Sequence, residues 1–360
     1  MQATTNKNIM DNEQRVIISD NLKKDLSETI SQCEHDKIFI LTDENTSNVC
    51  MPLLKGIECL KGAEKLIIGV SDTAKNFGTL GKVWTSLSNG GASRHSLMIN
   101  LGGGMVTDLG GFAASTFKRG INFINIPTTL LAMVDASVGG KTGINYNGLK
   151  NEIGVFNDSK FVILNTNFLK SLDDTNLRSG YAEMLKHGLI NNENMWAELV
   201  NYDIFHPDLM KLQVMVADSV KVKERIVKED PLEKGIRKAL NLGHTIGHAF
   251  ESFAMKEGHP ILHGYAVAYG LVCELYLCSI KTGFPSDKMR QTVRFIKDTY
   301  GKFDFTCDDY DILLELMRHD KKNTAGIINF TLLGNIGDIK INQTATKDEI
   351  FEALDFIREG

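Results

Sequence analysis

Several features that would mark particular protein classes are missing from this sequence. No apolar run approaches the ~20 residues that a membrane-spanning helix needs. The segment 1–14 is polar and lacks the apolar core of a secretory signal peptide, so we expect a frayed lead-in there. The formal net charge is only −5 at pH 7, which predicts neither a nucleic-acid nor a membrane partner. Any binding site for an anion must therefore be local.

Cysteine is sparse and has no ligand-like spacing. The chain holds 6 cysteines, and no two of them form a C-x-x-C pair. Cys273 and Cys278 lie within an apolar run with helical periodicity. We interpret the cysteines as buried free thiols of a protein in the reducing cytoplasm.

What is present is an ordinary globular composition with two different patterns. The chain has 360 residues, 42% hydrophobic and 24% charged, enough for two domains with full cores. Up to about residue 170, short apolar runs alternate with helical segments such as 76–89 and 107–118, which is typical of a parallel sheet with crossover helices. The predicted buried parallel strands are 37–43, 65–70, 96–104, 121–127 and 160–166.

The pattern changes after about residue 172. Amphipathic helical windows then dominate, and one segment, 326–334, reads as a short strand or hairpin arm. The predicted helices are 174–190, 208–229, 236–254, 263–282 and 286–299. The sequence thus predicts an α/β domain over 1–172, a mostly helical domain over 173–360, and a cleft between them.

Two glycine-rich segments suggest anion binding. The segment 135–142, DASVGGKT, has the Gly-Lys-Thr end of a P-loop, but Asp135 stands at the first glycine position, which disfavours an ATP site. Lys141 still calls for an anionic partner. In 98–112, a predicted strand is followed by Gly102-Gly103-Gly104 and then by a predicted helix. Such a glycine turn lets a diphosphate approach the backbone at the start of the helix. The alternative is a tight turn that binds no ligand.

Polar residues form a narrow stripe in the predicted helix 236–254. Arg237, Asn241, His244 and His248 are spaced by four, three and four residues, so they lie within roughly 60° of a helix circumference. The remaining residues are largely apolar. Buried polar groups need partners, which here are either a ligand or metal, or one another in a core network.

His244 and His248 resemble half of a zinc site. The metalloprotease pattern H-E-x-x-H is excluded, because a threonine stands where the glutamate must be. His263 begins a helical window, and Glu183 lies in an otherwise apolar one, with His187 as a competitor. Two histidines and one carboxylate would leave an open position, as catalytic zinc sites do.

Longer segments carry a family resemblance. GGGMVTDLGGFAASTFKRG, IPTTLLAMVDASVGGKTGIN, KNEIGVF, SGYAEMLKHGLI, KGIRKALNLGHTIGHAFE, LHGYAVAYG and DKKN resemble the 3-dehydroquinate synthase family of sugar phosphate cyclases, over about 37–340. The resemblance implies a Rossmann-like N-terminal domain, a helical C-terminal domain, NAD, a Zn²⁺ or Co²⁺ ion, and a homodimer. It implies conversion of 3-deoxy-D-arabino-heptulosonate 7-phosphate to 3-dehydroquinate and phosphate in the shikimate pathway, with NAD recycled within each turnover.

Site residues follow from this resemblance position by position. The implied metal ligands are Glu183, His244 and His263. The implied catalytic residues are Asp135, Lys141, Lys186, Glu233, Arg237, Asn241 and His248. The implied substrate-binding residues are Arg119, Lys141, Asn151, Lys186, Lys223, Arg237, Asn241, His248 and Lys321. The implied NAD-binding residues are Asp72, Lys75, Gly103, Gly104, Met105, Val106, Asp108, Thr128, Thr129, Lys141, Lys150, Phe168, Leu169 and Ser171, to which the strand-end position adds Asp43 and Asn45 as ribose contacts.

Three positions depart from the family pattern, and three other functions remain open. Tyr265 replaces a carboxylate after the His-Gly pair, Asp72 replaces a glutamate, and Thr107 replaces a glycine. The alternatives are a cyclase for a sugar phosphate without a carboxylate, a metal-dependent polyol dehydrogenase, and a non-catalytic scaffold. The Glu/His/His set leaves zinc and cobalt both open as the native metal.

Overall fold

The computed structural model describes residues 14–147, 149–318 and 327–359. The chain divides into two compact units. The first contains the chain up to Thr128 together with Ala136–Asn165, and the second contains Thr129–Asp135 and the chain from Thr166 onward. The lead-in predicted for 1–14 lies, apart from Gln14, outside the described residues, as does Lys321.

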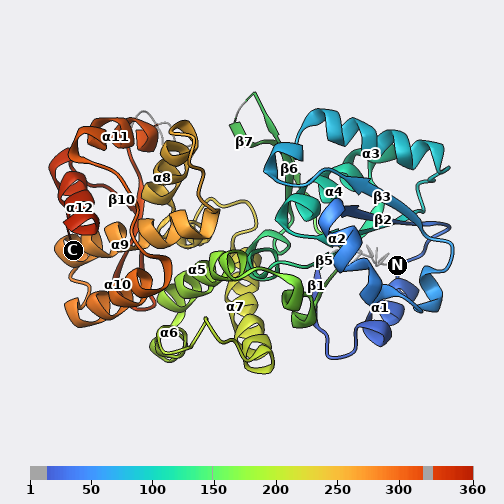
Figure 1. The fold of residues 1–360 in the computed structure, drawn as a ribbon, viewed down its shortest axis with the longest axis horizontal. Helices are drawn as coiled ribbons and strands as arrows, with labels where there is room; N and C mark the ends of the chain where they lie inside the picture. Colours follow the sequence, from blue (N-terminus) through green and yellow to red (C-terminus); the bar gives the residue numbers. More distant parts are fainter. Residues whose placement is uncertain (1–13, 148, 319–326, 360) are drawn as a thin grey trace, which may run out of the picture. The chain divides into compact units, whose positions relative to one another are not determined.

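A six-stranded sheet forms the centre of the first unit (Figure 1). All of its strand pairs are parallel, in the order β1-β8-β5-β4-β2-β3. The strands are β1 Arg15–Ile18, β2 Ile38–Asp43, β3 Glu64–Ile68, β4 Leu97–Gly102, β5 Asn122–Pro127 and β8 Phe161–Leu164. The five predicted strands are confirmed, whereas β1 was not predicted, because four residues are too few to show a pattern.

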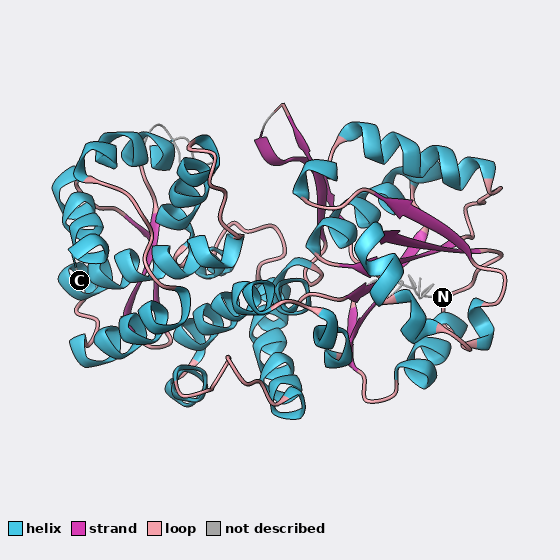
Figure 2. Cartoon of the chain, viewed as in Figure 1, coloured by secondary structure: helices cyan, strands magenta, loops and turns pink. Residues whose placement is uncertain are grey.

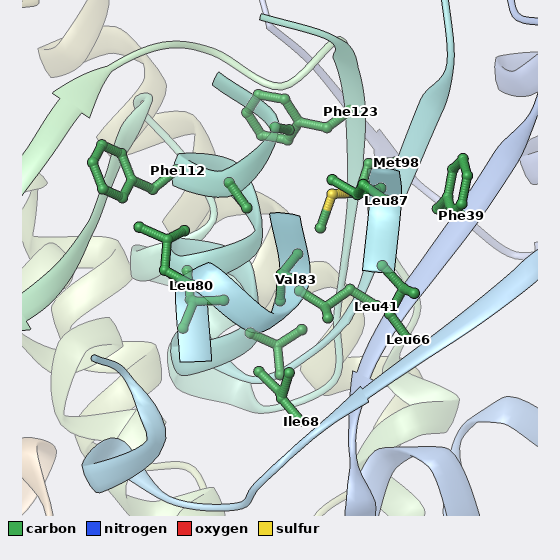
Figure 3. Packing of buried hydrophobic residues seen from close by; sticks show 14 of the residues in the cluster. Phe39, Leu41, Leu66, Ile68, Leu80, Val83, Leu87, Met98, Phe112 and Phe123 are labelled. Atoms are coloured by element: carbon green, nitrogen blue, oxygen red, sulfur yellow. The ribbon is translucent and has the colours of Figure 1, made fainter. Parts of the chain in front are cut away.

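Helices α3 and α4 bury their apolar faces against this sheet (Figure 3). In α3, Leu80, Val83 and Leu87 recur at helical spacing, so all three point to the same side and meet Phe39 and Leu41 of β2 in one cluster. The helices of this unit are α1 Leu22–Ser31, α2 Glu44–Val49, α3 Phe77–Asn89 and α4 Gly104–Thr116. Helix α4 begins at Gly104 rather than at the predicted 107, because extended Gly103 serves as its N-cap.

Strand β3 corrects the expectation of strands buried on both faces. Leu66 and Ile68 are buried, but Ile67 between them is 55% exposed. Successive side chains of a strand point to opposite faces, so only one face of β3 is covered. Its place at the edge of the sheet accounts for this.

A two-stranded antiparallel hairpin, β6 Lys141–Tyr146 and β7 Leu149–Phe156, was not predicted. Its second strand has no buried residue, and Leu149, Ile153 and Phe156 are exposed. A strand without a buried face leaves no alternating apolar pattern in the sequence.

The second unit is mostly helical, with one small two-stranded sheet (Figure 2). Its helices are α5 Asp174–Asn191, α6 Glu193–Val200, α7 Leu209–Glu229, α8 His244–Lys256, α9 His263–Thr282, α10 Ser286–Tyr300, α11 Tyr310–Arg318 and α12 Lys347–Glu359. Strands β9 Phe330–Asn335 and β10 Asp338–Gln343 pair antiparallel, which confirms the hairpin arm predicted near 326–334. None of the helices within the described ranges is both long and apolar enough to span a bilayer.

The continuous helix predicted over 236–254 is wrong. The segment forms a 3₁₀ turn, Ile236–Asn241, and then the separate helix α8. Gly243 between them has φ +79°, a left-handed conformation that favours glycine and ends any right-handed helix. The polar stripe is therefore divided into an Arg237/Asn241 part and a His244/His248 part.

Candidate functional site

Three helices of the second unit bring the predicted metal ligands together. His244 and His263 are the first residues of α8 and α9, and Glu183 lies within α5. The Nε2 atoms of both histidines lie 3.3 Å from the same oxygen, Oε1 of Glu183. One ligand atom from each of the three residues lies within 4.8 Å of the others. This donor set fits a divalent transition metal such as zinc or cobalt.

Glu183 is completely buried and beside a buried cation. Its carboxylate contacts the ammonium group of Lys186, one helical turn along α5, and the exposed fractions of these two side chains are 0% and 1%. Burial by itself would raise the pKa of Glu183, but Lys186 and His244 together hold it well below its usual range. The carboxylate is therefore ionised, the form in which it coordinates a metal.

The second ring nitrogen of His263 faces a carboxylate that was not predicted. Nδ1 of His263 lies 3.3 Å from Oε2 of Glu251 on α8. Burial would lower the pKa of His263, but the contacts with Glu183 and Glu251 raise it to about 10. A carboxylate behind a ligating imidazole fixes the orientation of the ring. Glu251, His248 and His263 also form a second, adjoining set of donor atoms within 4.8 Å.

His248 lies beside the predicted ligands but one turn further along α8. Its ring centroid is 5.3 Å from that of His244 and 5.8 Å from that of His263. Its i, i+4 spacing from His244 brings the two rings to the same side of the helix. A molecule bound at Glu183, His244 and His263 would therefore lie within reach of His248.

An ion pair between buried Lys223 and partly buried Asp135 lies in the same unit. The Lys223 ammonium donates to Oδ1 of Asp135 at 2.6 Å and also contacts the Asp135 carbonyl oxygen. Burial would raise the pKa of Asp135 and lowers that of Lys223; the lysine outweighs burial at Asp135, so the pKa of the aspartate falls. Both groups are charged, and each keeps the other charged. Asp135 is thus paired with Lys223, which is not expected of the first glycine position of a P-loop.

His187 is a buried histidine with one hydrogen-bond partner among the described residues. It is 0% exposed, and its Nδ1 lies 2.7 Å from the hydroxyl oxygen of Ser219. Burial, and after it the charge of Lys186, lower the pKa of His187 to about 3. It lies within reach of Glu183 and Asp135, as a third group of donor atoms. The imidazole is therefore neutral in the folded protein.

The lowered pKa of His187 in the folded protein makes the stability of the protein sensitive to acid. Its pKa is depressed from 6.5 to about 3, so the stability that it supports is present above pH 6.5 and is lost as the pH falls toward 3. We expect metal-free His187→Gln to gain about 1.4 kcal/mol per pH unit relative to wild type below pH 6.5, measured by urea unfolding. His206→Gln, at a residue whose side chain is 87% exposed, serves as the control. Parallel curves for wild type and His187→Gln would contradict the prediction.

The Arg237/Asn241 part of the stripe is held by the loop before it. Arg237 is 2% exposed, and its Nη1 donates to the Pro231 carbonyl oxygen at 2.6 Å. Asn241 donates from Nδ2 to Oε1 of Glu233 at 3.0 Å. The contact between Asn241 and Glu233 joins two predicted catalytic residues, although the helix that was expected to align the stripe is broken.

In the first unit, the glycine turn lies where the order of the strands reverses. From β2, the chain goes to β3 on one side and then to β4 on the other, so β2 and β4 flank the switch point of the sheet. Asp43 ends β2, and Gly103 and Gly104 follow the end of β4. Ligands of open parallel sheets bind at this point, at the carboxyl ends of the strands. Asp43 itself caps α2, accepting from the Thr46 backbone N–H at 2.7 Å.

Other predicted cofactor and substrate residues contact one another in this unit. The Lys75 ammonium lies 2.5 Å from Oδ2 of Asp108 and also contacts Oδ1 of Asn151. Asn145, which was not predicted, donates to Oδ2 of Asp72 at 3.0 Å, and the Lys150 ammonium lies 3.7 Å from the same oxygen. Asp72 thus keeps a carboxylate in this network despite replacing the family's longer glutamate.

The remaining predicted residues have varied surroundings. Arg119 and Lys141 are exposed, and Met105, Val106 and Thr128 belong to the first unit around the glycine turn. Phe168 and Leu169 are buried, whereas the Ser171 hydroxyl donates to the Phe168 carbonyl oxygen at 3.0 Å. These three and Thr129 belong to the second unit.

Unusual backbone conformations coincide with predicted site residues. Among described residues other than glycine, Arg119, Asn151 and Glu233 have φ values of +68°, +51° and +58°. Ser71, next to Asp72, combines φ +72° with ψ 165°, a region occupied almost only by glycine. Such conformations cost of order 1–3 kcal/mol and concentrate at functional sites.

Tyr265, the departure after the His-Gly pair, does not contact the three ligands in any described interaction. Its hydroxyl accepts from Nε of Arg178 at 3.0 Å, and its ring lies edge-on to Tyr300 with centroids 5.1 Å apart. The carboxylate that contacts His263 comes instead from Glu251. Glu251 ends the stretch GHAFE, but its pairing with a residue twelve positions away on another helix has no signature in spacing.

Comparison with known proteins covers both units. Residues 65–179 match the family described as 3-dehydroquinate synthase N-terminal, and residues 180–323 match 3-dehydroquinate synthase C-terminal. Among solved structures, the fold is similar to 2-epi-5-epi-valiolone synthase from Streptomyces hygroscopicus subsp. jinggangensis with NAD⁺ and Zn²⁺ bound, with a TM-score of 0.84 at 23% identity, covering 96% of this chain and 97% of that one. It is also similar to 2-deoxy-scyllo-inosose synthase complexed with carbaglucose-6-phosphate, NAD⁺ and Co²⁺, with a TM-score of 0.81 at 23% identity, covering 96% of each chain. The predicted fold class is confirmed.

Similarity to a curated relative identifies the family as well as the fold. The 3-dehydroquinate synthase of Parabacteroides distasonis is 56% identical over 348 residues, which cover 97% of this chain and 99% of the relative. Such identity over the whole length, together with the matches of both halves, confirms the family predicted from the sequence motifs. The protein whose helices bring Glu183, His244 and His263 together is a member of the 3-dehydroquinate synthase family.

Proposed function

We propose that this enzyme converts 3-deoxy-D-arabino-heptulosonate 7-phosphate to 3-dehydroquinate and phosphate, a step of the shikimate pathway to the aromatic amino acids. The convergence of Glu183, His244 and His263 on one point of the second unit is the observation that carries the proposal. The identity with the Parabacteroides relative favours this substrate over a sugar phosphate without a carboxylate. A non-catalytic scaffold would not need the converging ligands or the buried cations around them.

We assign a divalent zinc or cobalt ion to the three ligands and NAD to the switch point of the sheet. When bound, the ion would supply positive charge that lowers the pKa of the substrate hydroxyl, and NAD would supply reversible hydride acceptance. Oxidation to a ketone acidifies the neighbouring C–H, which permits elimination of phosphate. Opening of the ring and an intramolecular aldol step then give the carbocycle, and the overall conversion involves no net oxidation of the substrate.

The chain itself contributes charge and orientation. Lys186, Lys223 and Arg237 are 1%, 6% and 2% exposed, and lysine and arginine are rarely buried unless paired. We propose that these cations bind the carboxylate and the phosphate of the substrate, together with Asn241 and His248. Glu183 and Asp135 balance part of their charge. The substrate phosphate is the proposed base for its own elimination, since no single side chain stands out for that role.

The test uses the heptulosonate phosphate in large excess over NAD. Because NAD is oxidant and then reductant within one turnover, phosphate release should far exceed the NAD present, and no NADH absorbance should accumulate. A polyol dehydrogenase would build up NADH and release no phosphate. A cyclase for neutral sugars would leave this substrate unchanged but release phosphate from a hexose or heptose phosphate. Phosphate release that stops at one equivalent of NAD would refute the closed redox cycle.

We further propose a cytoplasmic homodimer. All six cysteines are free thiols, as expected in a reducing compartment, although Cys307 is exposed and Cys59 only partly buried, against the expectation that all are buried. Arg119, exposed and in a left-handed conformation, is the residue that we assign to the neighbouring subunit's site. This assignment of Arg119 to the neighbouring subunit allows a direct test of the dimer.

Mixed dimers of two inactive variants should regain activity. If Arg119 completes the partner's site, a dimer of one Arg119→Ala chain and one His244→Ala chain contains one complete site. After full subunit exchange, we expect up to about a quarter of the wild-type rate, since half of the dimers are mixed. Absence of recovery after exchange proven by differently tagged chains would place Arg119 in the site of its own chain.

A further inference from the structure

A charged residue lies inside an otherwise apolar part of the second unit. Glu274 on α9 is 0% exposed, and its chain neighbours Cys273 and Leu275 are also fully buried. The predicted site does not use Glu274. A buried carboxylate is costly unless hydrogen bonds compensate for its lost hydration, so its partners indicate what it does.

Those partners are backbone N–H groups at the start of α8. Oε2 of Glu274 accepts from the Gly243 N–H at 2.6 Å, and Oε1 accepts from the Ile246 N–H at 3.2 Å. The first N–H groups of a helix have no partner within the helix, and the helix dipole makes this end positive. The carboxylate of α9 therefore caps α8 from outside.

The local sequence gives α8 no side-chain cap of its own. Three other helices of the unit, α5, α6 and α7, are capped by the side chains of Asp173, Asn192 and Asp208. Helix α8 has Gly243 at this position, which has no side chain to accept a hydrogen bond. The break at Gly243 thus creates a helix start whose N-cap residue has no side chain, and Glu274 supplies a carboxylate there from another helix.

Close packing of the two helices delivers Glu274 to this point. Gly270 lies one helical turn before Glu274, on the same side of α9. A Cβ atom at Gly270 would collide with the carbonyl oxygen of Gly243, so α9 approaches α8 at its first residues. His244 lies between the two N–H groups that Glu274 binds, and its Nε2 faces Glu183.

We propose that Glu274 is a positioning residue for the metal site. Its carboxylate fixes the first turn of α8, and with it the His244 imidazole, against Glu183. The inference rests on the proposed function insofar as His244 is a metal ligand. Glu274 acts through the backbone N–H groups of Gly243 and Ile246, on either side of His244.

The test compares metal binding by Glu274→Gln and a matched control, with Co²⁺ as the probe. Glutamine keeps the size and one acceptor oxygen, but its amide group places N–H opposite a backbone N–H. We expect the Co²⁺ dissociation constant, measured by competition with a chelator, to rise about tenfold, and the visible absorption of the bound Co²⁺ to change. Leu275→Ala, at a neighbouring buried residue, should lower the unfolding temperature but leave both Co²⁺ readouts unchanged.

Several outcomes would overturn the inference. Wild-type affinity and spectrum in Glu274→Gln would do so, as would equal weakening in Leu275→Ala, which indicates general destabilisation. Hydrogen exchange of the wild-type protein provides a check without a variant: rapid exchange of the Gly243 and Ile246 amides would show that the cap is not formed. Failure of the wild-type chain to bind Co²⁺ would instead refute the proposed metal site itself.

Discussion

Exhaustive chelation should abolish turnover of this enzyme, and added Zn²⁺ or Co²⁺ should restore it. Loss of the charge that acidifies the substrate hydroxyl removes several kcal/mol of transition-state stabilisation, roughly a thousandfold or more in rate. The measurement is phosphate release after chelation, with the metal content of the same sample determined by elemental analysis. Full activity in a verified metal-free sample would refute the assignment.

Variants then locate the metal within the chain. His263→Ala removes one proposed ligand and should weaken metal binding at least about tenfold. His206→Ala is the matched control, because this histidine belongs to the same unit but its side chain is 87% exposed. Equal metal affinity in the two variants would show that His263 is not a ligand.

The second large effect concerns the ion pair between Lys223 and Asp135. Lys223→Met leaves a mostly buried carboxylate without its ammonium partner, since the exposed fractions of the two side chains are 7% and 28%. We expect a loss of about 3 kcal/mol in the free energy of unfolding, near the lower end for a broken buried pair because Asp135 keeps some solvent contact. Lys221→Met is the control on the same helix; its pair with Asp218 is exposed and should contribute less than about 1 kcal/mol.

A double variant separates stability from function at this pair. Replacing both partners, Asp135→Leu with Lys223→Met, removes the uncompensated charge and should restore most of the stability. Activity should remain lost, because both residues are proposed to serve the substrate. A double variant that recovers the rate of phosphate release together with its stability would reduce the pair to a structural role.

Residues close in sequence were the ones whose arrangement was predictable. Buried strands such as 96–104 were found because a short apolar run that ends in glycines is typical of a strand buried in a parallel sheet. The polar stripe failed as one helix because its spacing continues through Gly243, and periodicity does not reveal a left-handed residue. The hairpin β6–β7 was missed since no face of its second strand is buried.

Contacts between residues far apart in the sequence could not be predicted from the spacing of residues. Glu251 reaches His263 across two helices, and Glu274 reaches Gly243 across 31 positions. His187 was considered only as a competing ligand, whereas burial beside Ser219 makes it a neutral core histidine. The choice of the metal ligands relied on family resemblance, because the sequence pattern alone left His248 and His187 as alternatives.

The short segment Thr129–Asp135 belongs to the second unit but is synthesised before the first unit is complete. It is made between two parts of the first unit, yet it packs with the second, where Asp135 meets Lys223. Strand β1, at one edge of the sheet, has to wait for β8, which emerges from the ribosome more than a hundred residues later. The C-terminal half of the chain thus lacks Thr129–Asp135, a segment that belongs to its own unit. Gene fragments divided near residue 165 should yield a C-terminal piece that leaves Lys223 without its carboxylate, so the natural assembly unit is the uncut chain.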